Sequence, residues 1–185
     1  MPEAPALSQA ATAADLAQGP RLLLLLAVAE QLYAIDTQAV VEVIPQVILR
    51  PVSGAPAHQS GVFNFRGRVV PVVDVTQLIA GRACAGHLSS RIIMVRHQSA
   101  VGETALLGLL AERVTDTLLK SLASFQPAEG AAAQRPFLGG VALDERGLIQ
   151  LLLTDRLASE ALAGVAAPEL TLSDPSSVGG DDGWT

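Results

Sequence analysis

Apolar residues recur along the chain in short runs that are separated by glycine, proline and charged residues. Such runs, many of them rich in valine and isoleucine, are typical of strands. The pattern predicts strands over residues 22–29, 31–36, 61–65, 69–75, 91–96, 104–111, 114–119, 137–143 and 148–153. Residues 38–44 fit a short helical turn that runs into a strand, and 45–59, with three prolines, fit a loop or an edge strand. Helical spacing is clear over 154–162, where Thr154 is the expected N-cap. We therefore expect an all-β protein with a short C-terminal helix.

The two ends of the chain lack this pattern. Residues 1–19 are rich in alanine and proline, and residues 164–185 are rich in serine, glycine and aspartate. We expect a flexible N-terminal tail and a flexible acidic C-terminal tail on either side of a domain at 20–163. The leucine run at 22–26 is too short to span a membrane and follows a segment that is not basic. It predicts a buried strand rather than a signal peptide or an inserted helix.

The second half of the chain repeats the order of features in the first. Residues 60–78 resemble residues 139–157, with the turn glycines Gly67 and Gly147 offset by one position. Tyr33-Ala34-Ile35, followed by 40–44, likewise resembles 107–109, followed by 113–118. Neither half has enough apolar residues for a core of its own, so we expect two small barrels packed on a shared interior.

The composition of the chain argues against several classes of function. The net charge is −6, and the twelve basic residues form no stripe, which argues against a nucleic-acid partner. Cys84 is the only cysteine, so no disulfide forms within the chain, as fits a reducing compartment. His58, His87 and His97 stand in no nucleophile or metal signature. We therefore expect no catalytic residues, no metal and no cofactor.

The segment 61–75 is the best functional candidate. Arg66 and Gly67 form a turn between two apolar strands, and a guanidinium there needs a partner, either within the chain or on another protein. Glu42 and Asp74 are the candidate internal partners of Arg66. Asp74 looks like half of a catalytic carboxylate pair, but no matching second acid follows, so we expect it to make structural hydrogen bonds. Asn64 is expected to satisfy backbone groups of the turn.

These residues carry a family resemblance. The strongest block follows the pattern P-x(4)-G-x-x-N-x-R-G-x(3)-P-x-x-D and consists of Pro56, Gly61, Asn64, Arg66, Gly67, Pro71 and Asp74. A second block is Tyr33-Ala34-Ile35 followed by 40–44, and weaker blocks lie at 108–110 and 140–141. Together they resemble the CheW family of chemotaxis coupling proteins over about residues 21–163. Phe65 stands where the family usually has leucine, and Leu153-Thr154 replaces an Asp-Leu, so the second half departs further.

The resemblance implies two intertwined, SH3-like, five-stranded β-barrels. It implies a non-catalytic cytoplasmic scaffold, associated with receptor arrays, that couples the hairpin tip of a chemoreceptor to the regulatory domain of a CheA-type histidine kinase. The residues it implicates in partner binding are Arg66, Glu42, Val40, Val41, Asn64, Phe65 and Gly67. We expect one of Val40 and Val41 to be core and the other exposed. The Asn-Phe-Arg-Gly form favours an alternative chemosensory system, such as a surface-sensing (Wsp-type) pathway, over the flagellar one.

Two other classes of function compete with this one. A small β-barrel that binds a ligand or serves an enzyme as an accessory domain would show one apolar pocket with converging polar groups. A hydrolase is the weakest alternative, because the sequence has no nucleophile elbow and no metal-ligand cluster. Trp184, the sole tryptophan, lies in the acidic tail and is either inert or part of a short docking peptide.

Overall fold

The computed structural model of the protein describes residues 19–98, 102–114, 116–127, 130 and 134–163. The strands are β1 (Arg21–Val28), β2 (Gln31–Asp36), β3 (Val40–Pro45), β4 (Gln59–Phe65), β5 (Arg68–Asp74), β6 (Arg91–Gln98), β7 (Thr104–Ala111), β8 (Asp116–Lys120), β9 (Leu138–Asp144) and β10 (Gly147–Leu152). The helices are α2 (Val75–Ala80), the 3-10 turn η1 (Leu122–Ser124) and α3 (Thr154–Ala161). Every predicted strand is present, and so is the C-terminal helix. The expected tails lie outside the described residues, apart from Gly19.

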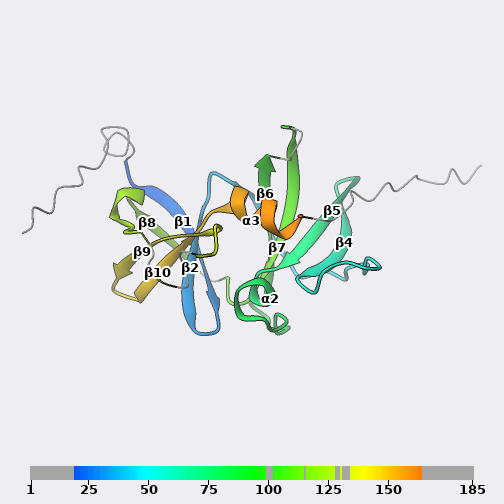
Figure 1. Ribbon diagram of the computed structural model, residues 1–185, viewed down its shortest axis with the longest axis horizontal. Coiled ribbons are helices and arrows are strands. Elements are labelled where there is room, and N and C mark those ends of the chain that lie inside the picture. Colours follow the sequence, from blue (N-terminus) through cyan, green and yellow to red (C-terminus); the bar gives the residue numbers. More distant parts are fainter. Residues whose placement is uncertain (1–18, 99–101, 115, 128–129, 131–133, 164–185) are drawn as a thin grey trace, which may run out of the picture.

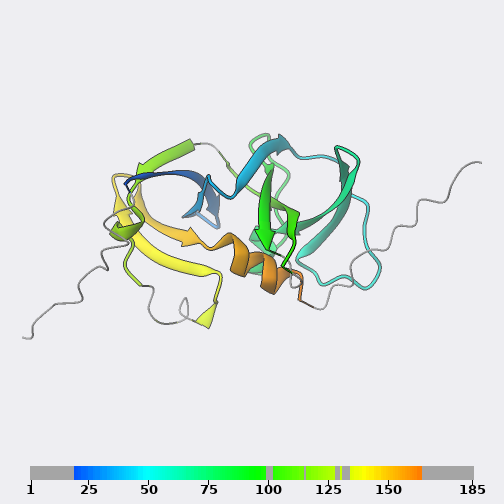
Figure 2. The ribbon, with the colours of Figure 1, turned by 90° about the horizontal axis from the view of Figure 1, so that it is seen from above.

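The strands form two five-stranded sheets with the same internal order. Sheet A runs β8-β1-β2-β10-β9, and sheet B runs β3-β6-β7-β5-β4. Each sheet curls into a small barrel, here called barrel A and barrel B, and the two lie side by side with α3 across their junction (Figures 1 and 2). Barrel A combines β1 and β2 from the first half of the chain with β8, β9 and β10 from the second, and barrel B combines β3, β4 and β5 from the first half with β6 and β7 from the second, so both halves of the chain build both barrels. The predicted pair of intertwined barrels is confirmed.

Strand registers fix which positions of the two barrels correspond. In barrel A, Leu151 of β10 lies beside Ala34 of β2, and in barrel B, Val72 of β5 lies beside Gly108 of β7. The antiparallel registers extend this equivalence to the other strands. Equivalent pairs used below are Glu42 with Asp116, Val43 with Thr117, Arg68 with Gly147, Asp74 with Leu153, and Arg96 with Ala27. The repeat predicted from the sequence is therefore a true duplication of architecture.

Three apolar clusters hold the domain together. The largest joins both barrels and includes Leu26, Ile35, Ile93 and Leu109, with Leu157 of α3 packed among them. A second cluster fills barrel B, and a third, around Leu23 and Leu25, fills barrel A. Both faces of β1 are thus buried, which is why its sequence is a continuous leucine run rather than an alternating one.

The two helices begin differently, and the sequence predicted only one of them. Val75, expected at the end of a strand, begins α2, whose N-cap Asp74 accepts a hydrogen bond from the Gln77 N–H through Oδ1 at 2.9 Å. The second oxygen of Asp74 accepts the Cys84 N–H at 2.7 Å, so the structural role predicted for this buried carboxylate is confirmed. The prediction that Thr154 caps α3 is wrong, because Leu153 is the N-cap and makes no side-chain hydrogen bond.

No helix in the described part of the chain combines the length and the apolar character needed to cross a bilayer.

Candidate functional site

The β4–β5 hairpin presents Arg66 at its tip. Phe65 and Arg68 are directly paired, which leaves Arg66 and Gly67 as a two-residue turn with φ values of 51° and 81°. Two positive φ values are the signature of a type I′ turn, for which Asn-Gly is the preferred sequence. Asn64 Oδ1 accepts the Gly67 N–H at 2.8 Å, as expected for a side chain that satisfies the turn. An arginine at the first central position costs about 1 kcal/mol of left-handed strain, so its presence needs a compensating use.

Two neighbours hold the Arg66 side chain in place. Its Nη2 donates to Glu42 Oε2 at 2.6 Å, and the guanidinium lies 5.0 Å from the centroid of the Phe65 ring. The side chain is still 70% exposed, and that of Glu42 is 38% exposed. Of the two internal partners predicted for Arg66, Glu42 is therefore the one that it contacts. The pair joins β3, an edge strand of sheet B, to the turn that follows the other edge strand, β4, and leaves most of the guanidinium exposed to solvent.

Val40 and Val41 divide as expected between core and surface. The β3–β6 register shifts between Val40 and Glu42, a bulge that makes Val41 the extra residue. Val40 packs against the shared core, while Val41 is 37% exposed. Val43 is also exposed. The result is a short apolar strip on β3 beside the Arg66–Glu42 pair.

Phe65 lies in the core rather than on the surface. It belongs to the cluster that fills barrel B, and its ring meets Phe63 edge-on at a centroid distance of 6.2 Å. The apolar role expected at this position is present. Because the ring is 9% exposed, its contribution to any partner contact acts through the guanidinium that it supports.

Sequence reasoning missed several residues of this surface. Val43 and Val69 are exposed next to the predicted residues, and Arg68 and Arg96 lie at the same end of barrel B. The signal for Val43 was present in the sequence, because on an edge strand it shares a face with Val41. Arg96 belongs to a strand far along the chain, and only the sheet order places it near the hairpin.

Barrel A repeats the ion pair. Asp116, the equivalent of Glu42, lies 2.9 Å from Arg146, which is at the tip of the β9–β10 hairpin. Arg146 stands one position later in its hairpin than Arg66 does, in keeping with the offset of the turn glycines. In both barrels, therefore, an acid on one edge strand (β3 or β8) pairs with an arginine at the tip of the hairpin that contains the other edge strand (β4 or β9).

A second ionic cluster organises the loop after α2. Glu112 is 2% exposed and accepts two hydrogen bonds from Arg82, at 2.8 and 3.1 Å, and one from the Ala85 N–H at 2.7 Å. The hydrogen bond from Arg82 holds the pKa of the Glu112 carboxyl below its ordinary value. Nearby, burial raises the pKa of the Cys84 thiol to about 11, so this cysteine is not a ready nucleophile. Within the described residues, no group of three or more histidine, cysteine, aspartate or glutamate side chains has the arrangement of a metal site.

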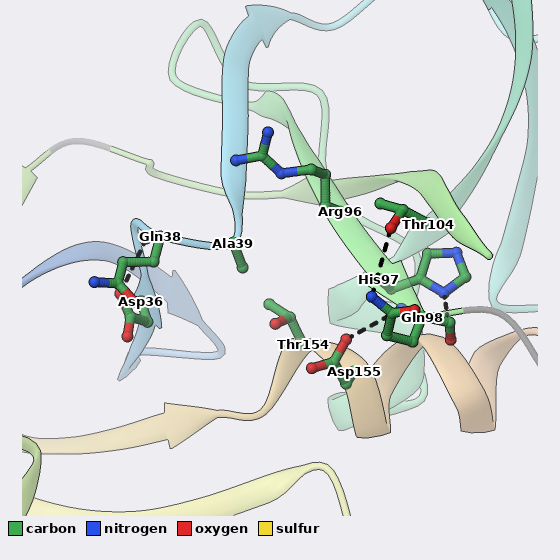
Figure 3. A pocket seen from close by; sticks show the side chains of 9 residues that line it. All are labelled: Asp36, Gln38, Ala39, Arg96, His97, Gln98, Thr104, Thr154 and Asp155. Atoms are coloured by element: carbon green, nitrogen blue, oxygen red, sulfur yellow. Dashed lines mark hydrogen bonds between the residues drawn. The ribbon is translucent and has the colours of Figure 1, made fainter. Parts of the chain in front are cut away.

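The pockets do not favour a ligand-binding barrel. One of about 430 Å³ lies between the barrels and is lined by polar side chains, including Asp36, His97, Thr154 and Asp155 (Figure 3). Another, of about 570 Å³, is a groove between the loop at 46–49 and Cys84. The first is polar and lies outside the apolar clusters that fill the barrels, and the second borders the barrel B cluster at Leu49, Cys84 and Leu110.

Comparison with known proteins identifies the family. The model of the CheW-like domain matches residues 22–162. The chain belongs to the CheW-like domain family. A chemotaxis protein CheW of Rhizobium meliloti is 32% identical over 145 residues, which cover 77% of this chain and 90% of that protein. A probable chemotaxis protein CheW of Rhizobium etli is 26% identical over 148 residues, covering 79% and 92%.

A solved structure agrees with the fold. The scaffolding protein TtCheW from Thermoanaerobacter tengcongensis superposes on this CheW-like domain with a TM-score of 0.65. The alignment covers 75% of this chain and 87% of that one, at 24% sequence identity. This likeness supports the double SH3-like barrel independently of the sequence match.

Proposed function

We propose that this protein is a non-catalytic scaffold that couples chemoreceptors to a CheA-type histidine kinase in a chemosensory array. Its relatives named as chemotaxis proteins support this, since the match spans both barrels and most of their length. The filled barrels, and the burial that raises the pKa of the Cys84 thiol to about 11, agree with a protein that works by binding. In this role the protein works in the cytoplasm, next to membrane receptors, without entering the bilayer.

The receptor-facing surface in this proposal centres on Arg66. The observation that carries it is a guanidinium, 70% exposed, held by Glu42 and Phe65 beside the exposed Val41. An arginine fixed in one orientation next to apolar surface has the character of a binding hot spot, because little side-chain entropy is lost on contact. Asn64 and Gly67 serve the site by shaping the turn, and Val40 by anchoring β3 to the core.

Binding measurements test the proposal. Titration of the full chain with the regulatory domain of the cognate kinase, and separately with the cytoplasmic hairpin of a cognate receptor, should give micromolar dissociation constants, as transient interfaces do. An absence of binding to both at about 100 μM would exclude the scaffold function. Neighbouring genes for a kinase and a receptor would indicate which pathway the protein serves: flagellar chemotaxis, twitching motility or surface sensing.

A further inference from the structure

Two more arginines share the end of barrel B at which Arg66 lies. Arg68 begins β5 directly opposite Phe65, and Arg96 lies near the end of β6 opposite Leu106. Phe65 and Leu106 both belong to the packing that fills barrel B, so the two arginines stand at the rim of this filled interior. The end of β6 and the tip of the β4–β5 hairpin point to the same side of the molecule (Figure 1). We call Arg66, Arg68 and Arg96 the arginine rim.

Arg68 and Arg96 differ from Arg66 in having no internal acid. Both side chains are exposed, and within the described residues neither guanidinium makes a hydrogen bond or an ion pair. The Arg96 guanidinium is turned toward β3 and away from Asp155 (Figure 3). Asp36, which lines the same pocket as Arg96, is paired with Arg21 at 2.8 Å.

Barrel A shows that the fold does not need these charges. Gly147 occupies the position equivalent to Arg68, and Ala27 occupies the position equivalent to Arg96. Barrel A nonetheless has the same strand order and a filled interior. Its Asp116–Arg146 pair also repeats the Glu42–Arg66 bridge. Two arginines that the duplicated architecture replaces with glycine and alanine therefore serve something other than folding.

The rim brings three arginines to one end of barrel B in a chain of net charge −6. Among the described residues only Arg66 of the three is paired with an acid, Glu42, and Asp155 of the pocket beside Arg96 accepts the Gln98 N–H at 3.4 Å. Two exposed valines lie close to these arginines in the sheet. Val69 follows Arg68 on β5, and Val41 lies on β3, the strand that pairs with the Arg96 strand β6. The complementary surface carries carboxylates next to apolar side chains.

We infer that Arg68 and Arg96 are specificity determinants of the docking surface, and that they select a helical protein surface bearing carboxylates next to its apolar contact residues. The inference rests on the proposed function, in which the occupant is the hairpin tip of a receptor. Arg66 and the β3 valines then supply the contact, while Arg68 and Arg96 distinguish one hairpin from another by its acids. Long-range attraction from the two free guanidiniums raises the association rate and makes it sensitive to salt.

The test uses the full chain and the cytoplasmic hairpin of a cognate receptor. Arg68→Gly and Arg96→Ala copy the residues of barrel A, so melting temperatures should stay near that of the wild type, and Arg68→Gln provides a second variant that keeps a long side chain. Each should weaken binding about five- to tenfold at low salt and less at high salt. Arg50→Ala is the matched control, because Arg50 is exposed, its backbone pairs with Val62 of β4, and its guanidinium makes no hydrogen bond or ion pair among the described residues. This variant should change the affinity less than twofold.

A second receptor hairpin, in which the Asp and Glu residues of the tip are changed to Asn and Gln, turns the comparison into a double-mutant cycle. Wild type and the Arg68 and Arg96 variants should bind this neutralised hairpin equally. If wild type and the Arg68 and Arg96 variants bind the native hairpin with equal affinity, the inference fails and the scaffold function stands. If wild type binds no hairpin, the receptor-docking function fails first. A loss seen with phosphatidylserine vesicles and not with the hairpin would overturn the inference in favour of a lipid surface.

Discussion

Glu42 and Asp116 occupy the same position in the two barrels, and each is paired with an arginine from the tip of the hairpin across its barrel's open edge. The Glu42–Arg66 contact is 2.6 Å and the Asp116–Arg146 contact is 2.9 Å. A feature present twice is part of how each barrel closes. What differs is the setting, since only Arg66 lies over an aromatic ring and beside unpaired arginines.

This duplication gives the Arg66 hypothesis a matched control. Arg66→Ala and Arg146→Ala each remove one exposed ion pair, so each should change the free energy of unfolding by at most about 1 kcal/mol. Only Arg66→Ala should weaken binding to the receptor hairpin, by more than tenfold, as expected of a hot-spot arginine. Thermal melts and titrations of both variants measure the two effects. Equal destabilisation with normal binding would show that both arginines are purely structural.

Arg66→Lys tests whether shape or charge matters. Lysine keeps the positive charge but loses the planar fork that both donates to Glu42 and stacks on Phe65. We expect binding nearly as weak as in Arg66→Ala. A dissociation constant within twofold of that of the wild type would mean that the partner recognises only the positive charge at this position.

Much of the architecture could be predicted from the sequence because strand patterns are local. The hairpin at 61–75, the repeat and the family motif all come from neighbouring residues. The helix α2 could not be predicted, because Val75 continues a β-branched run and only the Asp74 side chain ends the strand. The arginine rim could not be predicted either, because Arg68 and Arg96 are far apart in the sequence and only the sheet order, with β7 between β5 and β6, brings them to the same end of barrel B.

Asp74 should be important for stability. Asp74→Ala leaves the N–H groups of Gln77 and Cys84 without their acceptors, at a cost of about 3 kcal/mol. Asp74→Asn retains one acceptor oxygen and should cost roughly half as much. Denaturant unfolding measures both free energies. A neutral Asp74→Ala would contradict the structural role, whereas the folded fraction of either variant should still bind its partners.

Glu112 should make the protein sensitive to acid. Its pKa is lowered in the folded state, so the unfolded state binds the proton more readily. The stabilisation is therefore complete above the unfolded pKa of about 4.3 and is lost as the pH falls through the lower folded pKa. Glu112→Gln should cost about 1–3 kcal/mol at pH 7, and the difference from wild type should shrink below about pH 4. A gap that is constant with pH would show that packing, not ionisation, sets the cost.

The apolar strip on β3 can be tested by replacing one of its valines with the residue found at the equivalent position of barrel A. Val43 is 38% exposed, and its equivalent in barrel A is Thr117. Val43→Thr keeps the shape and the β propensity of the side chain, so the melting temperature should change by less than about 2 °C. If the partner covers Val43, exchanging a methyl for a hydroxyl should weaken binding by about 1 kcal/mol, or roughly fivefold. Val47→Thr, on the loop after β3 and 39% exposed, is the control that should leave binding unchanged. Equal effects of the two substitutions would place the docking surface away from β3.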